Sequence, residues 1–228
     1  MLIDKIKTFL NIPSEDNGNG LRASSSGSCT RQIAYKYHGF EGIPLNWRAK
    51  LVFDLGDKIE TQMAGLSEQF GLKDRQKTIS VEIGGVKIFG HVDGIFEDMV
   101  VDFKSTTTYA LKDARKGNVG SYKYTMHFYM KGAGLKKALL VYYCKETSAL
   151  EEVVIEWDEN VWLEIVSKFT KVITSTKDSL PDRDYGPNAN GFLPWQCSYC
   201  SYVKQCYPQA NLTFTDDGKP QLKIKKEK

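Results

Sequence analysis

Three cysteines stand close together near the end of the chain, in the stretch CSYCSYVKQC, residues 197–206. Their spacing supplies three thiolates, one fewer than a tetrahedral metal ion or an iron–sulfur cluster needs. Of the two other cysteines, Cys144 lies among apolar and aromatic residues, where a buried thiol is expected. Cys29 follows a Gly/Ser-rich loop and precedes an expected helix, whose N-terminus favours a thiolate. Cys29 is therefore the better candidate for the fourth ligand.

The spacing leaves the identity of the bound metal open. Structural zinc sites usually combine two short pairs of ligands, and a distant single cysteine with a local triplet is unusual for them. Iron–sulfur clusters are held by four thiolates at several spacings. Four unrelated free thiols are the remaining alternative, and the close grouping of three cysteines argues against it.

A second group of residues that could do chemistry lies in GHVDGIFEDMVVDFKS, residues 90–105. Side chains alternate across a strand, so Asp102 and Lys104 share a face and Phe103 points the other way. If the strands on either side of the ED turn pair, Asp93 approaches Asp102. Two adjacent carboxylates repel each other, and a divalent cation such as Mg²⁺ removes that repulsion. With an ammonium beside them, these are the parts of a metal-dependent phosphodiesterase.

The same residues also have an ordinary explanation, because an Asp-x-Lys pair on a strand is common as solvated surface charge. The glycines on either side of Asp93 favour the catalytic interpretation. A glycine inside a strand indicates that another group approaches the backbone closely.

The elements that must position these residues follow from hydrophobic periodicity and turn signals. Their expected order is a loop over 14–28, a helix starting at 29, a long helix over 47–70, three antiparallel strands across 77–107, a helix near 121–133, strands at 138–146 and 151–157, and an amphipathic helix within 160–180. This order predicts an α/β fold, in which helices flank a mixed central sheet.

Composition bounds the class of protein. The chain has 228 residues, of which 41% are hydrophobic and 26% charged, as in an ordinary globular protein that can bury a core. The sequence shows no signal peptide and no apolar run of membrane-spanning length. We therefore expect a reducing cytoplasm, where cysteines are more often ligands than disulfides. The net charge of +3 permits nucleic-acid binding without arguing for it.

The stretches GHVDGI and VVDFK resemble the core of the PD-(D/E)XK nucleases, in particular the RecB-like exonucleases. LGDKIE, residues 55–60, is similar to that family's helix, which carries a glycine and, four residues later, a His or Glu. The resemblance implies a restriction-endonuclease-like core that binds Mg²⁺ or Mn²⁺. The implied metal ligands are Glu60, Asp93, Asp102 and the carbonyl oxygen of Phe103. Lys104 would complete the catalytic set by orienting the attacking water.

The next family element is a helix with a Gln and, four residues later, a Tyr. Here Tyr129 is present as a candidate supporting residue, but Thr125 stands at the Gln position. In the family that Gln helps to position the lysine or the substrate, so the departure concerns the fine geometry. A Tyr on such a helix otherwise packs with its hydroxyl satisfied.

The Thr125 departure is the one feature that favours the alternative, a non-catalytic Fe–S protein that binds nucleic acid or a helicase. A third hypothesis is a structural protein, or a partner protein of a helicase, that is held together by a zinc ion.

The cysteines resemble those of a subset of RecB-like nucleases that includes AddB-type nuclease domains and CRISPR-associated exonucleases. GSCTRQIAY, residues 27–35, is similar to the segment around that subset's first ligand and contains Arg31, a second candidate supporting residue. The resemblance implies a [4Fe–4S] cluster held by Cys29, Cys197, Cys200 and Cys206. This cluster would join an N-terminal segment (1–46) to a C-terminal segment (181–210), with the core (47–180) between them in the sequence. The nuclease would thus be a single domain, 1–210, followed by a tail, 211–228.

We therefore predict a metal-dependent DNA exonuclease. Its expected substrates are DNA ends or single strands in recombination, repair or phage DNA metabolism, in the cytoplasm of a prokaryotic cell or a phage-infected host. A helicase or recombination protein is the candidate partner. Basic residues would neutralise phosphates and aromatic residues would stack on bases, although each one alone reads as solvated charge or core. They are Arg22, Arg31, Arg48, Lys50, Lys112, Arg115, Lys116 and Lys123, with Tyr35, Trp47 and Tyr109.

Overall fold

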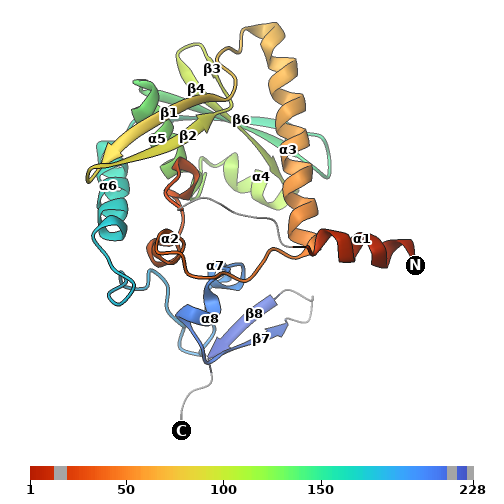
Figure 1. Cartoon of the computed structure of the whole chain (residues 1–228). Coiled ribbons are helices and arrows are strands. Elements are labelled where there is room, and N and C mark those ends of the chain that lie inside the picture. Colours follow the sequence, from red (N-terminus) through yellow and green to blue (C-terminus); the bar gives the residue numbers. More distant parts are fainter. Residues whose placement is uncertain (13–19, 215–219, 225–228) are drawn as a thin grey trace.

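The computed structural model describes residues 1–12, 20–214 and 220–224 (Figure 1). Its helices are α1 (Leu2–Leu10), η1 (Ala23–Ser25), α2 (Thr30–Tyr37), α3 (Trp47–Ser67), η2 (Glu68–Phe70), α4 (Thr108–Ala114), α5 (Tyr122–Ala133), α6 (Glu159–Ile173), α7 (Trp195–Ser198) and α8 (Val203–Cys206). Its strands are β1 (Lys77–Ile83), β2 (Val86–Val92), β3 (Gly94–Phe96), β4 (Met99–Thr106), β5 (Lys137–Cys144), β6 (Leu150–Glu156), β7 (Ala210–Phe214) and β8 (Pro220–Ile224).

The central sheet has the order β3-β4-β5-β6. β4 and β5 are parallel, and the other two pairs are antiparallel. A parallel pair needs a long crossover, which here contains α4 and α5. The predicted α/β architecture, a mixed sheet flanked by helices, is therefore confirmed.

Helices cover both faces of this sheet. On one face, Val100 of β4 belongs to a large cluster with Met126 of α5 and Phe169 of α6. On the other, Val101 and Phe103 pack in a smaller cluster with residues from α3 and the loop after it. Successive side chains of a strand point to opposite faces, so Asp102 and Val100 share the α5 face.

The middle strand of the three predicted across 77–107 is divided at Asp93. β2 ends one residue before it and pairs with β1 in a separate hairpin, whereas β3 begins one residue after it and joins the central sheet. Val92 and Asp93 are both buried, so the simple alternation expected from one continuous strand is wrong here. The bend turns the Asp93 carboxylate inward.

The ends of the chain contain elements that the sequence did not predict. α1 precedes the long helix α3, and Asn11 Oδ1 accepts a hydrogen bond of 2.8 Å from the N–H of Trp47 at the start of α3. The segment 211–228, expected to be a tail, contains most of the β7–β8 hairpin. Residues 14–19 of the predicted loop over 14–28 lie outside the described residues, as do 225–228. None of the described helices is long and apolar enough to cross a membrane.

A buried histidine on α5 makes folding depend on pH. His127 is 2% exposed, its Nδ1 lies 2.6 Å from the carbonyl oxygen of Lys123, and its Nε2 accepts a 2.9 Å hydrogen bond from the N–H of Asp158. The ring is therefore neutral, with its proton on Nδ1. Burial lowers its pKa below the ordinary value of 6.5.

We expect the contribution of His127 to stability to be complete above about pH 6.5 and to be lost as the pH falls below it, because the unfolded chain then binds a proton that the folded one excludes. An NMR titration of the imidazole signals measures this directly. A His127 ring that titrates at or above the ordinary value of 6.5 would contradict the assignment.

Candidate active site and cysteine site

Two buried carboxylates lie together at the bend between β2 and β3. Asp93 is 6% exposed and Asp102 of β4 is 3% exposed. The N–H of Phe103 donates a 2.8 Å hydrogen bond to Oδ2 of Asp93, which fixes this carboxylate against β4. The sequence prediction that strand pairing brings Asp93 to Asp102 is confirmed.

Lys104 supplies the positive charge beside them. Its Nζ lies 2.5 Å from Oδ2 of Asp102 and 3.2 Å from the carbonyl oxygen of Phe103, to which it donates a hydrogen bond. Oδ2 of Asp102 is fully buried and has no hydrogen bond of good geometry among the described residues, so the ammonium is its counter-charge. A cation thus already bridges one carboxylate and one backbone oxygen at this place.

The electrostatics of the three groups disfavour two ionised carboxylates at this place. Burial raises the pKa of Asp93 to about 8, and the nearby Asp102 carboxylate adds to the rise. Burial also raises the pKa of Asp102, although Lys104 opposes it. Burial would lower the pKa of Lys104, but the Asp102 carboxylate outweighs this effect and the pKa is raised overall. Without a further cation Asp93 is therefore largely protonated at neutral pH, because the single ammonium balances only one of the two buried carboxyl groups.

Glu60 of α3 is the third predicted carboxylate. It is half-buried, and its charge contributes to the raised pKa of Asp93, so it lies near the pair. Its Oε1 accepts a 2.9 Å hydrogen bond from Nε2 of Gln76. Within the described residues, no three or more His, Cys, Asp or Glu side chains stand in the arrangement of an assembled metal site.

Sequence reasoning missed Gln76. It has a left-handed backbone (φ +53°), a conformation that costs energy for a residue other than glycine. The loop before it is tied to β3 by two backbone hydrogen bonds between Lys73 and Ile95, of 2.8 and 2.9 Å. Arg75 forms a 3.2 Å ion pair with Glu68 at the end of the long helix. A glutamine in a polar loop gives no sequence signal, because only the fold brings it to Glu60.

Tyr129 of α5 faces the carboxylates. It is 6% exposed, and burial raises its pKa, with further contributions from Asp102, Asp93 and Glu60. The sequence prediction that Tyr129 lies beside these residues agrees with this placement. Thr125, one turn earlier on α5, is also buried and stands where the resemblance expects a glutamine.

Gly90 allows Tyr129 to reach this position. A Cβ on Gly90 would stand 2.4 Å from Cβ of Ala23 and 3.0 Å from Cε1 of Tyr129, closer than packed atoms allow.

We expect Gly90→Ala to lower the free energy of unfolding by about 1–3 kcal/mol, because the added methyl overpacks this contact. Gly65→Ala is the matched control: the new methyl meets nothing within 4 Å on α3, and helix propensity favours it by up to about 1 kcal/mol. Chemical denaturation measures both, and equal stabilities would contradict the overpacking.

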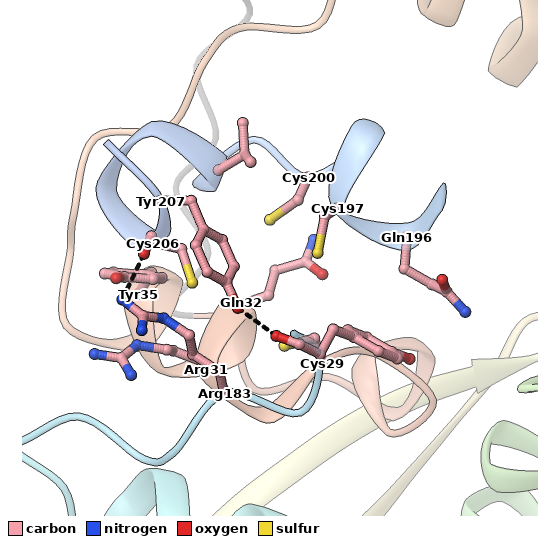
Figure 2. Close-up of a pocket in the computed structure, with 12 residues that line it drawn as sticks. Cys29, Arg31, Gln32, Tyr35, Arg183, Gln196, Cys197, Cys200, Cys206 and Tyr207 are labelled. Atoms are coloured by element: carbon pink, nitrogen blue, oxygen red, sulfur yellow. Dashed lines mark hydrogen bonds between the residues drawn. The ribbon is translucent and has the colours of Figure 1, made fainter. Parts of the chain in front are cut away.

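The four predicted cysteine ligands line one pocket (Figure 2). Cys29 precedes α2, Cys197 belongs to α7, Cys206 ends α8, and Cys200 lies between those two helices. Burial raises the pKa of Cys197 to about 11, and the other three cysteines add to the rise, which shows that the four are neighbours. Cys144 is buried in β5 within the main core and does not line this pocket.

Protein contacts join the two segments that carry these cysteines. Asp184 Oδ2 accepts hydrogen bonds from the N–H and Oγ1 of Thr30, at 2.7 and 3.0 Å, at the start of α2. The N–H of Ile43 donates to the carbonyl of Ser201 at 2.8 Å. In Figure 1 the blue elements α7, α8, β7 and β8 gather beside α2.

A small apolar cluster closes the other side of the pocket. Leu222 of β8 packs with Leu193, Cys197 and Tyr207. Arg183 Nη2 donates a 2.7 Å hydrogen bond to the carbonyl of Cys206, and its guanidinium stands over the ring of Tyr207. The hairpin in the expected tail therefore packs in the apolar cluster beside the cysteine site.

The residues expected to contact DNA fall into different environments. Arg31 lines the cysteine pocket, and its buried Nε has no hydrogen-bond partner among the described residues. Tyr35 is 4% exposed and stacks on Tyr202 at 5.5 Å, so it is a packing residue, in agreement with the alternative that such an aromatic residue belongs to the core. Tyr109 is 79% exposed, and Arg115 forms a 2.6 Å ion pair with Glu151.

No protein-family model matches the chain, and no curated protein matches it. Solved structures, in contrast, do match the chain. The crystal structure of SSO0001 aligns over 91% of this chain and 96% of its own, with a TM-score of 0.55 and 19% sequence identity. An alkaline exonuclease from Laribacter hongkongensis, LHK-Exo, aligns over 75% of this chain and 92% of its own, with a TM-score of 0.50 and 14% identity. The chain therefore has the fold of SSO0001 and of this alkaline exonuclease.

Proposed function

We propose that this protein is a metal-dependent DNA exonuclease with Glu60, Asp93, Asp102 and Lys104 as its catalytic set. One observation carries the proposal: Asp93 and Asp102 are buried side by side with a single ammonium between Asp102 and the Phe103 carbonyl. Such a concentration of buried charge is costly for the fold and is typical of functional sites. The likeness in fold to an alkaline exonuclease gives further support.

Mg²⁺ or Mn²⁺ fits these oxygens. The ligands would be the carboxylates of Asp93, Asp102 and Glu60 and the carbonyl oxygen of Phe103, all hard oxygen donors of the kind that these ions prefer. Lys104 already places a positive charge against two of these groups. A bound divalent ion supplies Lewis-acid polarisation of the phosphate and activation of a water.

The protein's own groups then have defined roles. Because the pKa of Lys104 is raised, the side chain stays an ammonium, so it orients the attacking water or stabilises negative charge on the phosphate. It does not accept the water's proton. Tyr129, whose raised pKa keeps the phenol neutral, supports the carboxylates from α5.

The cysteine pocket is the proposed site of a [4Fe–4S] cluster. Among the described residues, four thiol side chains and no histidine or carboxylate line it, and all-thiolate sets are typical of such clusters. The described cysteines do not stand as an assembled metal site, so the proposal rests on the ligand types and on their shared pocket. The cluster would join 1–46 to 181–210 and would have a structural role.

The proposed substrates are DNA ends or single strands in recombination, repair or phage DNA metabolism, and a helicase or recombination protein is the proposed partner. The direct test incubates the anaerobically purified protein with end-labelled single- and double-stranded DNA in Mg²⁺, in Mn²⁺ and in EDTA. We expect release of nucleotides only with metal. Binding of DNA without cleavage in either metal would refute the enzyme and favour the non-catalytic Fe–S protein, for which Thr125 is the supporting feature.

Gln76 is expected to position Glu60. Gln76→Ala removes the hydrogen bond to Oε1 and frees the Glu60 side chain, so the affinity for Mn²⁺ should fall about 10- to 100-fold, as for other partners of metal ligands. Calorimetric titration of Mn²⁺ measures this without any turnover. The control is Lys73→Ala in the same loop, because the Lys73 side chain is exposed and only its backbone makes the contacts to β3. Equal Mn²⁺ affinity in the two variants would contradict a positioning role.

A further inference from the structure

We propose that a groove beside the cysteine pocket holds a base of a single-stranded nucleic acid, stacked on Trp195 and Tyr199. The groove has a volume of about 740 Å³ and lies between the Gly27–Cys29 loop, the start of α5 and the α7 region. This volume is that of an ordinary small-ligand site. The inference rests on the proposed nuclease function and names where its substrate strand lies.

The first observation is a pair of exposed aromatic side chains in the groove wall. Trp195 and Tyr199 are each 70% exposed, and their ring centroids lie 6.4 Å apart. Both line the groove, whereas other exposed rings, such as those of Phe70 and Tyr109, do not. Aromatic faces presented to solvent are the usual platform for unpaired bases, because every base has a π-face.

The second observation is an unpaired polar atom on Gln196, the residue that follows Trp195 in the sequence. Oε1 of Gln196 is buried and has no hydrogen-bond partner among the described residues. Gln196 lines the groove, and Figure 2 shows its side chain pointing away from the four cysteines. A buried acceptor without a donor is costly, and the amino or imino group of a base would satisfy it.

The charges of the groove suit a phosphate backbone. Lys123 and Lys168 line it, with their ammonium groups over the ring of Tyr124 at 4.8 and 4.9 Å. Lys168 is held in place by the carbonyl oxygens of Ser26 and Ser28. The carboxylate of Asp184 also lines the groove and reduces its positive charge, although its Oδ2 is engaged by Thr30.

The start of α5 lies between the groove and the proposed catalytic centre. Ser121 and Lys123 line it, and the residue between them, Tyr122, has its ring over the ammonium of Lys104, 5.6 Å from it. Gly27 permits this junction, because a Cβ there would stand 2.6 Å from the carbonyl oxygen of Ser121. A strand seated on Trp195 and Tyr199 would therefore lead along the start of α5 to Asp102 and Lys104.

The test measures binding of a fluorescent oligothymidine strand by the anaerobically purified full chain in EDTA, where no cleavage occurs. We expect Trp195→Ala and Tyr199→Ala each to weaken binding about 5- to 150-fold, the range of one lost base stack. Tyr199→Phe keeps the ring and should bind like the unmodified protein. Phe70→Ala removes an equally exposed ring outside the groove and should also bind normally.

The outcomes separate this inference from the proposed function. If the unmodified protein binds and cleaves DNA but Trp195→Ala and Tyr199→Ala bind as tightly as Phe70→Ala, the strand does not bind in the groove and the nuclease proposal stands. If Tyr199→Phe loses as much affinity as Tyr199→Ala, stacking is also refuted. If the unmodified protein neither binds nor cleaves DNA with either metal, both proposals fail.

Discussion

Replacing Asp102 by Asn is expected to lower the rate of DNA cleavage by about 10³-fold or more, a loss of several kcal/mol of transition-state stabilisation. Asn keeps the shape of the side chain but removes the charge that the proposed divalent ion requires. The position is 3% exposed, so no other side chain can take its place without rebuilding the site. Single-turnover cleavage of end-labelled DNA at saturating Mg²⁺ or Mn²⁺ measures the effect.

A matched control and a second variant make this test specific. Asp98 lies exposed in the turn between β3 and β4 with a left-handed backbone (φ +60°), which Asn tolerates well, so Asp98→Asn should cleave normally. Lys104→Ala should lower the rate by about 10²- to 10³-fold, the usual loss when a group that stabilises charge in the transition state is removed. Cleavage by Asp102→Asn at the level of Asp98→Asn would refute the catalytic set, and equal cleavage by every variant would indicate a contaminating nuclease.

Replacing Cys29 by Ala is the second large effect. The anaerobically purified variant should lose the brown colour and the absorbance near ~400 nm that an iron–sulfur cluster gives, because it removes the single ligand contributed by the N-terminal segment. Cys144→Ala should keep the colour, since Cys144 is buried in the main core and does not line the pocket. Iron and sulfide analysis of the two variants quantifies the difference.

The same variant should loosen the cysteine site. Metal binding that assembles with the fold contributes directly to folding free energy, so loss of the cluster leaves α2 and the α7–α8 region joined only by contacts such as Thr30–Asp184 and Ile43–Ser201. Limited proteolysis should cut Cys29→Ala faster than Cys144→Ala within 181–210. A colourless unmodified protein that contains zinc would refute the iron–sulfur cluster, and a colourless Cys144→Ala would refute the choice of ligands.

The sequence predicted the local elements well where periodicity is strong. The long helix over 47–70 is α3 with η2, and the amphipathic helix within 160–180 contains most of α6. The apolar positions of α6, such as Ile165 and Phe169, are buried as expected. On α3, however, Leu55 and Leu66 are 46% and 48% exposed, so a correct helical period did not predict which face is covered. Periodicity reports a possible buried face, and packing decides whether another element covers it.

The candidate site was likewise predicted from the sequence only in part. Asp93, Asp102 and Lys104 were predicted from one hairpin-like stretch, because neighbouring strands bring short-range residues together. The bend at Asp93 was not predicted, because it arises where the chain passes from the β1–β2 hairpin to the central sheet. The sequence alone did not decide the role of Tyr35, because an aromatic residue beside basic ones looks alike in sequence whether it is exposed or stacked in the core on Tyr202.

The sequence by itself determined the kinds of reactive groups, their short spacings and the helices and strands that carry them, because these depend on residues a few positions apart. Only the tertiary structure decided that Cys29 shares a pocket with the C-terminal cysteines, that Gln76 holds Glu60, and that the β7–β8 hairpin packs in the apolar cluster that contains Cys197. These contacts join segments far apart in the chain, so they depend on how the crossover and the layers pack. No local pattern of residue types encodes that packing.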